Sequence, residues 1–379
     1  MRNESTTPPS AGNNSNPSLQ RTVFQDLHKE MQGKMVEFAG WSMPVQYADG
    51  IMAEHKHCRH RASWFDVSHM GQIEIRGPDA ARQLESLVPA DLTGLQTGHC
   101  RYTFFTNEQG GILDDLIVTN AGDHLYLVVN ASMRDQDITH LRQHLGSANL
   151  TEVKDHALVA VQGPAAVGIL TALCPAAADL RFMQSCLVDI DGATCRLSRL
   201  GYTGEDGFEL SIPNTHAVDI SHHILSHEDC LPAGLGARDS LRLEAGLCLY
   251  GNDIDTSTTP VEASLAWAIP KRRRHEGGFP GATLISDQIT SGTSRRLVGI
   301  LPDGRVPARH GAPICDASGS PIGKVSSGGF GPTVGAPVVM GYVNSENSAQ
   351  GTELYLSVRG KLHSARVDTL PFVPHQYQR

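Results

Sequence analysis

The chain has 379 residues, enough for two or three compact units that each have a core. Hydrophobic residues make up 40% and charged residues 19%, a composition typical of globular proteins in water, and the apolar runs are too short to cross a bilayer. The formal net charge of −9 argues against broad binding to nucleic acid or to anionic membranes, since both require a positive field.

The N-terminal segment, residues 1–21, is predicted to be a disordered tail. It is rich in Ser, Thr, Asn and Pro, lacks the apolar core of a secretory signal, and has few arginines for a mitochondrial presequence. The eight cysteines are scattered along the chain without a CxxC pair, which favours reduced thiols over a disulfide scaffold or a zinc site. We therefore expect a reducing compartment: the cytoplasm of a bacterium, or the mitochondrial matrix if the source is eukaryotic.

The body of the protein, residues 22–270, interleaves strand and helix signals. Alternating or apolar runs predict strands at residues 72–76, 101–107, 112–118, 125–129, 157–162 and 208–212. Helical patterns with plausible caps cover residues 78–87, 133–145, 165–173, 215–225 and 236–245, the last followed by Gly246 as a stop. The residues 108–111, Glu-Gln-Gly-Gly, predict a hairpin turn. This order predicts an α+β fold with antiparallel sheets.

The pattern of secondary-structure signals changes after a linker at residues 271–280. Short β-type runs punctuated by Gly and Pro follow, with no helix signal. Residues 281–379 are therefore predicted to form a C-terminal all-β domain, a barrel.

Two adjacent acids, Asp114 and Asp115, interrupt an apolar strand. Asp is depleted in strands, and a buried carboxylate is costly unless it is paired or hydrogen-bonded. Side chains alternate along a strand, so the two acids point to opposite faces. One could line a cavity while the other meets solvent, or both could be hydrated at a strand end; periodicity does not say which acid faces a site.

A glycine-rich loop at residues 201–207 leads into a strand that carries Glu209 on the face opposite Phe208 and Leu210. Glu209 could accept hydrogen bonds from a ligand with N–H groups, or face solvent. Further along, Arg238 lies in the first turn of a predicted helix, where the helix dipole disfavours a cation. That placement suggests a specific carboxylate partner, with a surface ion pair as the alternative.

Two charged stretches have simpler interpretations. Residues 54–60, Glu-His-Lys-His-Cys-Arg-His, have metal-ligand types, but the cations Lys56 and Arg59 among them favour a polar helix face over a metal site. The basic run at residues 271–274 is either a solvated loop or a positive patch.

These features resemble the glycine cleavage T-protein (aminomethyltransferase) family. The resemblance runs in order from about Leu27 to Tyr377. It rests on residues 37–41, 65–70, 114–115, 201–209, 249–253 and 259–262, together with the Arg238 helix.

The resemblance implies two interleaved subdomains around a central folate tunnel, closed by the C-terminal barrel. It implies transfer of the one-carbon unit from aminomethyl-dihydrolipoyl H-protein to tetrahydrofolate, giving ammonia and 5,10-methylenetetrahydrofolate. The implied partners are lipoylated H-protein and folate, with no nucleic acid and no membrane, and we expect a monomer. No metal is required.

The family's functional residues carry over to matching positions. Asp115 matches the catalytic Asp near the folate pterin, and Arg238 matches an Arg near that Asp. Glu209 matches the Glu that hydrogen-bonds the pterin, and Tyr377 a Tyr of the substrate site. The tunnel-lining positions match Met70, Asn130, Tyr202 and Trp267. The segment around Phe24 departs from the family pattern, and whether Asp115 acts through charge or through proton transfer stays open.

Two rival functions remain. One is a folate-dependent demethylase of the same superfamily, against which the intact stretches 249–253 and 259–262 argue. The other is a non-catalytic folate-binding module that assists iron–sulfur assembly. That branch relies on a cysteine-centred motif in its C-terminal part, and neither Cys248 nor Cys315 lies in such a motif. Because the T-protein and H-proteins are both acidic, we also expect residues 271–274, with Arg295 and Arg296, to steer H-protein to the tunnel mouth.

Overall fold

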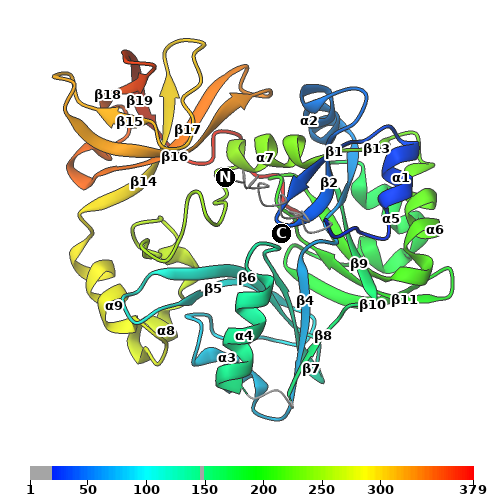
Figure 1. Cartoon of the computed structure of the whole chain (residues 1–379). Helices are drawn as coiled ribbons and strands as arrows, with labels where there is room; N and C mark the ends of the chain where they lie inside the picture. Colours follow the sequence, from blue (N-terminus) through cyan, green and yellow to red (C-terminus); the bar gives the residue numbers. More distant parts are fainter. Residues whose placement is uncertain (1–18, 146–148) are drawn as a thin grey trace, which may run out of the picture.

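The computed structural model describes residues 19–145 and 149–379, which form three lobes around a common centre, as Figure 1 shows. Most of the predicted tail, residues 1–18, lies outside the described part of the chain. At its end, Gln20 is already tied to the body by backbone hydrogen bonds to Gly40 and Ser42. No helix among the described residues is long and apolar enough to span a bilayer.

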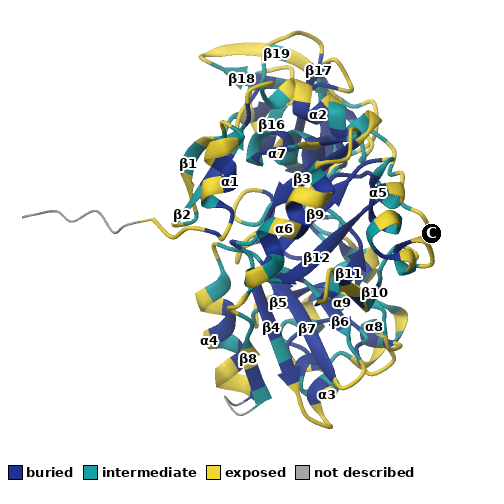
Figure 2. Cartoon of the chain, turned by 90° about the vertical axis from the view of Figure 1, so that its right-hand side faces the viewer, coloured by how far each residue is buried: buried dark blue, intermediate teal, exposed yellow. Residues whose placement is uncertain are grey.

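The first lobe is a five-stranded antiparallel sheet of order β5-β6-β7-β4-β8. Its strands are β4 (Gly71–Arg76), β5 (Cys100–Thr106), β6 (Ile112–Asn120), β7 (His124–Val129) and β8 (Leu150–Glu152). Helices α3 (Ala80–Glu85) and α4 (Arg134–Leu145) contribute Leu84 and Leu141 to a core shared with Ile73 and Leu127 of the sheet. Figure 2 shows exposed outer faces on α4 over buried strands.

The second lobe is a six-stranded sheet of order β10-β11-β12-β9-β3-β13. Its strands are β3 (Ala62–Asp66), β9 (His156–Gln162), β10 (Gln184–Ile190), β11 (Ala193–Arg199), β12 (Gly207–Pro213) and β13 (Cys230–Pro232). Strand β13 runs parallel to β3, so the sheet is mixed rather than purely antiparallel as predicted. The chain enters this sheet at β3, builds the first lobe, and returns at β9.

Helices cover both faces of the second sheet. One face packs against α1 (Gln25–Glu30), α5 (Ala166–Leu173) and α6 (Asn214–Leu225), and the short helix η2 (Pro175–Ala178) follows α5. The other face meets α2 (Ile51–His60) and α7 (Leu235–Glu244). A separate hairpin of β1 (Lys34–Phe38) and β2 (Trp41–Gln46) lies beside α7. Gly246 ends α7 with a φ of 65°, the left-handed conformation expected of a stop.

The third lobe is a closed six-stranded barrel of order β14-β17-β16-β15-β18-β19, as predicted. Its strands are β14 (Arg295–Pro302), β15 (Pro313–Cys315), β16 (Pro321–Gly331), β17 (Ala336–Asn344), β18 (Glu353–Val358) and β19 (Lys361–Asp368), with the short helix η4 (Ser345–Asn347). The α+β fold with a C-terminal barrel is therefore confirmed.

The connection into the barrel is helical, which the sequence did not predict. It contains η3 (Ala266–Ala268), α8 (Lys271–Glu276) and α9 (Ala282–Ser291). The prediction of an all-β region from residue 281 is wrong for α9. This helix buries only Ile285 fully, so it presents a weak apolar stripe to a sequence pattern.

An apolar cluster joins the barrel to the first lobe. It includes Phe104 and Ile112 from the first sheet, Leu243 from α7, and Val338 and Met340 from the barrel. Burying one such side chain stabilises the fold by roughly 1.5–3 kcal/mol, so these contacts lock the lobes together around the centre. Apolar side chains from all three lobes thus pack together next to the region between the lobes.

Candidate active site

The two acids of β6 point to opposite faces of the first sheet, and the structure shows which is which. Asp114 is fully buried and lies on the face of Leu116 and Val118, which belong to the core under α4. Asp115 lies on the face of Ile117 and Thr119, which line a cavity between the two sheets. Asp115 is therefore the acid that faces the centre of the molecule.

Asp115 is held by two side chains from neighbouring strands. The Tyr102 hydroxyl on β5 donates to Oδ2 of Asp115 at 3.0 Å, and Nδ2 of Asn130 donates to Oδ1 at 2.8 Å. The same Asn130 amide also donates to Oδ1 of Asp114 at 2.9 Å. Asn130 follows directly after β7, so it reaches both acids from the end of the adjacent strand.

Burial and the like charge of Asp114 raise the pKa of Asp115 to about 7. The hydrogen bonds from Tyr102 and Asn130 lower it, but they do not cancel burial. A carboxyl group with a pKa near the working pH can both accept and return a proton, which is the property required of an acid–base catalyst.

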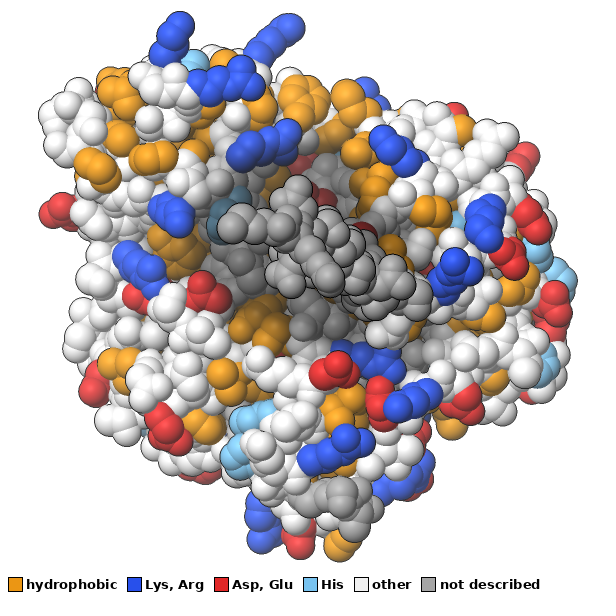
Figure 3. Space-filling view, viewed as in Figure 1, with side chains coloured by type: hydrophobic (Ala, Val, Ile, Leu, Met, Phe, Trp, Pro, Cys, Tyr) orange, Lys and Arg blue, Asp and Glu red, His pale blue; other side chains and the backbone are white. Residues whose placement is uncertain are grey.

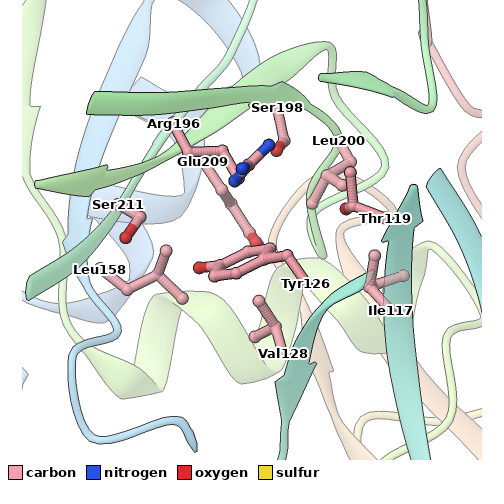
Figure 4. Close-up of a pocket in the computed structure, with 10 residues that line it drawn as sticks. All are labelled: Ile117, Thr119, Tyr126, Val128, Leu158, Arg196, Ser198, Leu200, Glu209 and Ser211. Carbon is pink, nitrogen blue, oxygen red and sulfur yellow. The ribbon is translucent and has the colours of Figure 1, made fainter. Parts of the chain in front are cut away.

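The cavity between the sheets has a volume of 10 Å³, room for about one water molecule. Figure 4 shows Glu209 of β12 and Arg196 of β11 pointing toward Tyr126 of β7. The Arg196 guanidinium lies over the Tyr126 ring at 5.0 Å. This space is too small for a folate ring. Figure 3 shows the side chains of the three lobes that surround the centre on this face.

Glu209 is buried, and it accepts no side-chain hydrogen bond from the residues that the structure describes. Burial raises the pKa of its carboxyl group, and the charge of Arg238 opposes that rise. Glu209 is thus a buried acceptor with free capacity. The solvent-facing alternative is wrong for this residue.

Arg238 extends from the first turn of α7. Its guanidinium lies over the Tyr202 ring at 4.8 Å and makes no ion pair within residues 19–145 and 149–379. Its Nη1 is buried without a hydrogen-bond partner. Burial lowers the pKa of Arg238, and the negative charge of Glu209 opposes this shift. Glu209 is therefore the carboxylate that interacts electrostatically with the Arg238 guanidinium. The alternative of a surface ion pair is therefore wrong for Arg238, whereas Arg242 on the same helix makes a buried ion pair with Asp253 at 2.7 Å.

The other predicted site residues divide between the centre and its surroundings. Met70 packs against the cluster of Tyr126 and Val128 beneath the centre. Trp267 is 67% exposed, and its ring stacks on the Tyr102 ring with 5.6 Å between the centroids. The side chains in contact around Asp115 therefore continue through Tyr102 to one that reaches solvent. Tyr202 donates its hydroxyl hydrogen bond to the carbonyl of Cys248.

Tyr377 lies apart from the cavity-lining residues. Its ring stacks on Phe182 at 4.0 Å, at the end of a C-terminal segment that returns from the barrel to the second lobe. The backbone N–H of Gln376 binds the carbonyl of Gly204 in the glycine-rich loop, so this segment also braces that loop.

Sequence reasoning missed two residues of the centre. Tyr102 pairs with Ile117 across β5 and β6, which places it diagonally from Asp115 on the same face. The predicted hairpin turn at residues 108–111 could have identified this pairing of the two strands. His69 is buried, its Nδ1 has no partner, and its ring packs edge-on against Phe38. Burial lowers the pKa of His69 to about 4, so it is neutral at physiological pH.

The basic run is neither a solvated loop nor a free positive patch. Arg272 pairs with Glu85 at 2.6 Å, Asp91 at 2.8 Å and Glu276 at 2.6 Å. Arg273 is buried and donates to the carbonyls of Glu85 and Val88.

The neighbouring cations are also engaged within the chain. Arg274 donates to the carbonyls of Ala266 and Ile269. Arg295 pairs with Glu262 at 3.0 Å, and exposed Arg296 contacts Ser264. Figure 1 shows α8 at the periphery and not at the centre, so the arginines of this run fasten the connecting helix to the first lobe.

The stretch at residues 54–60 also has a structural role. Glu54 is buried and accepts hydrogen bonds from the backbone N–H groups of Tyr47 and Gly234. His55 is fully buried between Ser240 and Thr333. The interpretation as a polar helix face was therefore wrong for these two residues. No group of metal-ligating side chains suited to a metal ion occurs among the described residues.

Comparison with known proteins places these observations in one family. Residues 24–273 match the GCVT N-terminal domain, and residues 295–374 match the glycine cleavage T-protein C-terminal barrel domain. The chain is 46% identical to the mitochondrial aminomethyltransferase of Dictyostelium discoideum, over 96% of this chain and 95% of that protein. It is also 46% identical to the mitochondrial aminomethyltransferase of Solanum tuberosum, over 96% of this chain and 92% of that protein.

A solved structure agrees. The crystal structure of glycine cleavage system aminomethyltransferase T from Bartonella henselae superposes with a TM-score of 0.91 at 40% identity, covering 96% of this chain and 100% of that chain. All eight cysteines of the present chain are free, as the sequence predicted.

Proposed function

Because the chain belongs to the glycine cleavage T-protein family and is an aminomethyltransferase of the glycine cleavage system, we propose that it transfers the one-carbon unit of aminomethyl-dihydrolipoyl H-protein to tetrahydrofolate. The products are ammonia, 5,10-methylenetetrahydrofolate and the dihydrolipoyl H-protein. We further propose that the chain works as a monomer, in the bacterial cytoplasm or, in a eukaryote, in the mitochondrial matrix.

The observation that carries the proposal is the position of Asp115. It is a carboxylate held by Tyr102 and Asn130, faces the centre, and has a pKa near neutrality. The reaction breaks the C–S bond to the lipoyl arm and the C–N bond to the departing ammonia, and it forms two C–N bonds to folate. The two protons lost from the folate nitrogens balance those gained by sulfur and ammonia.

Asp115 suits both demands of this exchange. As an anion, it stabilises positive charge on the carbon that leaves sulfur. Near its pKa, it accepts a proton from a folate nitrogen and returns it to a departing group. No covalent nucleophile is needed for these steps.

Three polar groups around the centre fit a pterin ring. Glu209 offers a buried acceptor for N–H groups, Arg238 has an unpartnered Nη1 donor, and His69 has an unpartnered Nδ1. Buried polar atoms are rarely left without partners, and each unsatisfied group costs about 1–3 kcal/mol. A ligand with both donors and acceptors, such as the pterin, would satisfy them together.

The test supplies aminomethylated H-protein and tetrahydrofolate and measures ammonia and methylenetetrahydrofolate in equal amounts. Reactions without tetrahydrofolate or with Asp115→Asn are the controls. Methyl transfer from a sulfonium or methylated amine, without ammonia from H-protein, would support the demethylase instead. Folate binding without turnover of any donor would support the non-catalytic module.

A further inference from the structure

A third carboxyl group lies behind the two acids of β6. Asp137 of α4 is 0% exposed, and neither of its carboxyl oxygens has a hydrogen-bond donor among the described residues. An ionised carboxylate in such a position costs several kcal/mol unless a cation or donors compensate it. The group is therefore not explained as a structural ion.

The charged and titratable groups around Asp137 offer no compensating cation. On its own helix, His140 is neutral because burial lowers its pKa to about 4, and Arg134 is bound to Glu152 at 2.6 Å. From β6, Asp114 faces Asp137, and Asp115 on the other face of the strand adds a further negative charge. Tyr250 is a further titratable neighbour of Asp137, whereas Tyr102, Tyr202 and Cys248 lie near Asp115.

The hydrogen-bond donors are divided unequally between Asp114 and Asp137. Asp114 accepts from the backbone N–H of Asn130 at 3.2 Å and from its side-chain amide at 2.9 Å. Asp137 receives no donor from the described residues, and the neighbouring group that most affects its protonation is the carboxyl group of Asp114. Two adjacent buried carboxyl groups share one proton, and the anion is the member that receives other donors.

We propose that Asp137 is a protonated, neutral carboxylic acid that donates its proton in a hydrogen bond to Asp114 and thereby keeps Asp114 anionic beside Asp115. Asp137 is then a positioning residue that acts on the reaction through Asp114. This assignment rests on the proposed function only where it concerns turnover. The proton stays on Asp137 throughout, so the reaction's proton balance is unchanged.

The direction of the pKa shifts agrees with this assignment. Burial and the neighbouring Asp114 raise the pKa of Asp137 to about 10, so it keeps its proton at neutral pH. Burial also raises the pKa of Asp114, but Asp137 and Asn130 oppose the rise, as expected for the member that carries the charge. The charge on Asp114 is in turn the second cause, after burial, of the raised pKa of Asp115.

The location of Asp137 separates its protonation from the substrate site. Asp137 borders a groove of 470 Å³ beside α4, together with Leu113, His140 and Gln143. Asp115 lies on the other face of the same sheet. Asp137 itself is fully buried, and it lies on the side of the sheet away from the centre.

The first experiment uses the unliganded protein and needs neither folate nor H-protein. Infrared spectra at mildly alkaline pH should contain a carbonyl band of a protonated carboxylic acid, and Asp137→Asn should remove it. Unfolding should release this proton, so wild type should lose thermal stability relative to Asp137→Asn as pH rises from about 4 toward about 10. Absence of the band, or a stability difference that does not change with pH, would overturn the proposal whatever the enzyme's reaction is.

The second experiment follows the pH dependence of kcat. The amide of Asp137→Asn still donates to Asp114, so its profile should match wild type and its kcat should stay within about threefold. Asp137→Leu removes the donor, so Asp114 takes up a proton and the midpoint assigned to Asp115 should move to lower pH. Asp114→Asn should move it the same way, and combining it with Asp137→Leu should give no further shift.

These outcomes separate positioning from a purely structural role. If Asp137→Leu lowers kcat or stability equally at every pH without moving the midpoint, Asp137 only fills space. If Asp137→Asn shifts the profile as far as Asp137→Leu does, the donated hydrogen bond is not what matters. Either result would contradict the proposal.

Discussion

The hydroxyl of Tyr102 donates a hydrogen bond of 3.0 Å to Asp115 from a residue that lies diagonally across the β5–β6 pair. The Tyr102 ring also stacks on Trp267, which is mostly exposed. A single tyrosine thus links the partly buried carboxylate of Asp115 to the molecular surface. It lowers the pKa of Asp115 and also stacks on an exposed aromatic side chain.

Tyr102→Phe should shift the pH–rate profile upward. The hydrogen bond lowers the pKa of Asp115, so its loss removes a stabilisation of the anion and raises that pKa further. A hydrogen bond to a charged group contributes about 1.5–3 kcal/mol, so the midpoint should move by about one pH unit or more. Steady-state kcat measured across pH checks this. Tyr250→Phe, which removes a hydroxyl bound only to the Ile112 carbonyl, is the control and should leave the midpoint in place.

Asp115→Asn should lose most of the turnover while the protein still folds and binds folate. Removing one preorganised electrostatic group typically costs about 10² to 10³ in rate. Asp114→Asn should retain more activity, since Asp114 lies on the other face of β6. Single-turnover rates and folate titration measure both effects. A larger loss of rate in Asp114→Asn than in Asp115→Asn would reverse the assignment of the two acids.

Tetrahydrofolate should stabilise the protein against heat, and Glu209 should contribute to that effect. A ligand that binds only the folded state adds about 2.7 kcal/mol at 100-fold excess over its Kd. Glu209→Ala should reduce the shift more than it changes the unliganded melting temperature, whereas Glu209→Gln should keep part of it through its carbonyl oxygen. Identical melting curves with and without millimolar tetrahydrofolate would count against folate as the acceptor.

Arg273→Ala should destabilise the fold without weakening H-protein binding. Its buried guanidinium satisfies the carbonyls of Glu85 and Val88, and leaving buried acceptors unpaired costs on the order of 1–3 kcal/mol. Lys271→Ala, an exposed change on the same helix, should stay within about 0.5 kcal/mol of wild type. Denaturant unfolding and stopped-flow association with H-protein give the two readouts. A stable Arg273→Ala variant with slower, less salt-dependent association would restore the steering role of this run.

Glu244→Gln should weaken the attachment of the barrel, most clearly at neutral pH. Burial alone would raise the pKa of Glu244, but His55, Thr333 and the N–H of Val334 outweigh burial and hold the pKa at about 2. A lowered pKa contributes stability that is present above about 4.5 and is lost as pH falls toward 2. The variant should lose about 3 kcal/mol at neutral pH, and the difference from wild type should shrink in acid.

Unfolding curves between neutral and acidic pH measure this difference. Asp239→Asn neutralises a mostly exposed acid on the same helix, and the pairing of such an exposed carboxylate contributes about 0–1 kcal/mol. It is the matched control. A difference between wild type and Glu244→Gln that stays constant with pH would mean that the charge of Glu244 does not hold the barrel.

Much of the secondary structure follows from local pattern. The alternation in residues 72–76 and the paired runs around Gly110 and Gly111 predicted β4 and the β5–β6 hairpin, because strand periodicity and turn residues are properties of short segments. The ordered set of family motifs predicted the glycine cleavage T-protein family and its aminomethyltransferase activity, both confirmed by the comparisons. The roles of Asp115, Glu209 and Arg238 stay predictions that the geometry supports.

What packing decides was beyond the sequence. Periodicity placed Asp114 and Asp115 on opposite faces, but only the position of α4 on one face and of the second sheet on the other shows which acid faces the centre of the molecule. A basic run predicts positive charge, whereas the burial of Arg273 depends on hydrogen bonds to the carbonyls of residues 188 and 185 positions earlier in the chain. In the same way, the residues next to Asp137 in the sequence predict only an ordinary helix position. Asp137 is a buried acid without donors because α4 packs on β6. Burial and charge pairing are set by such contacts between residues distant in sequence.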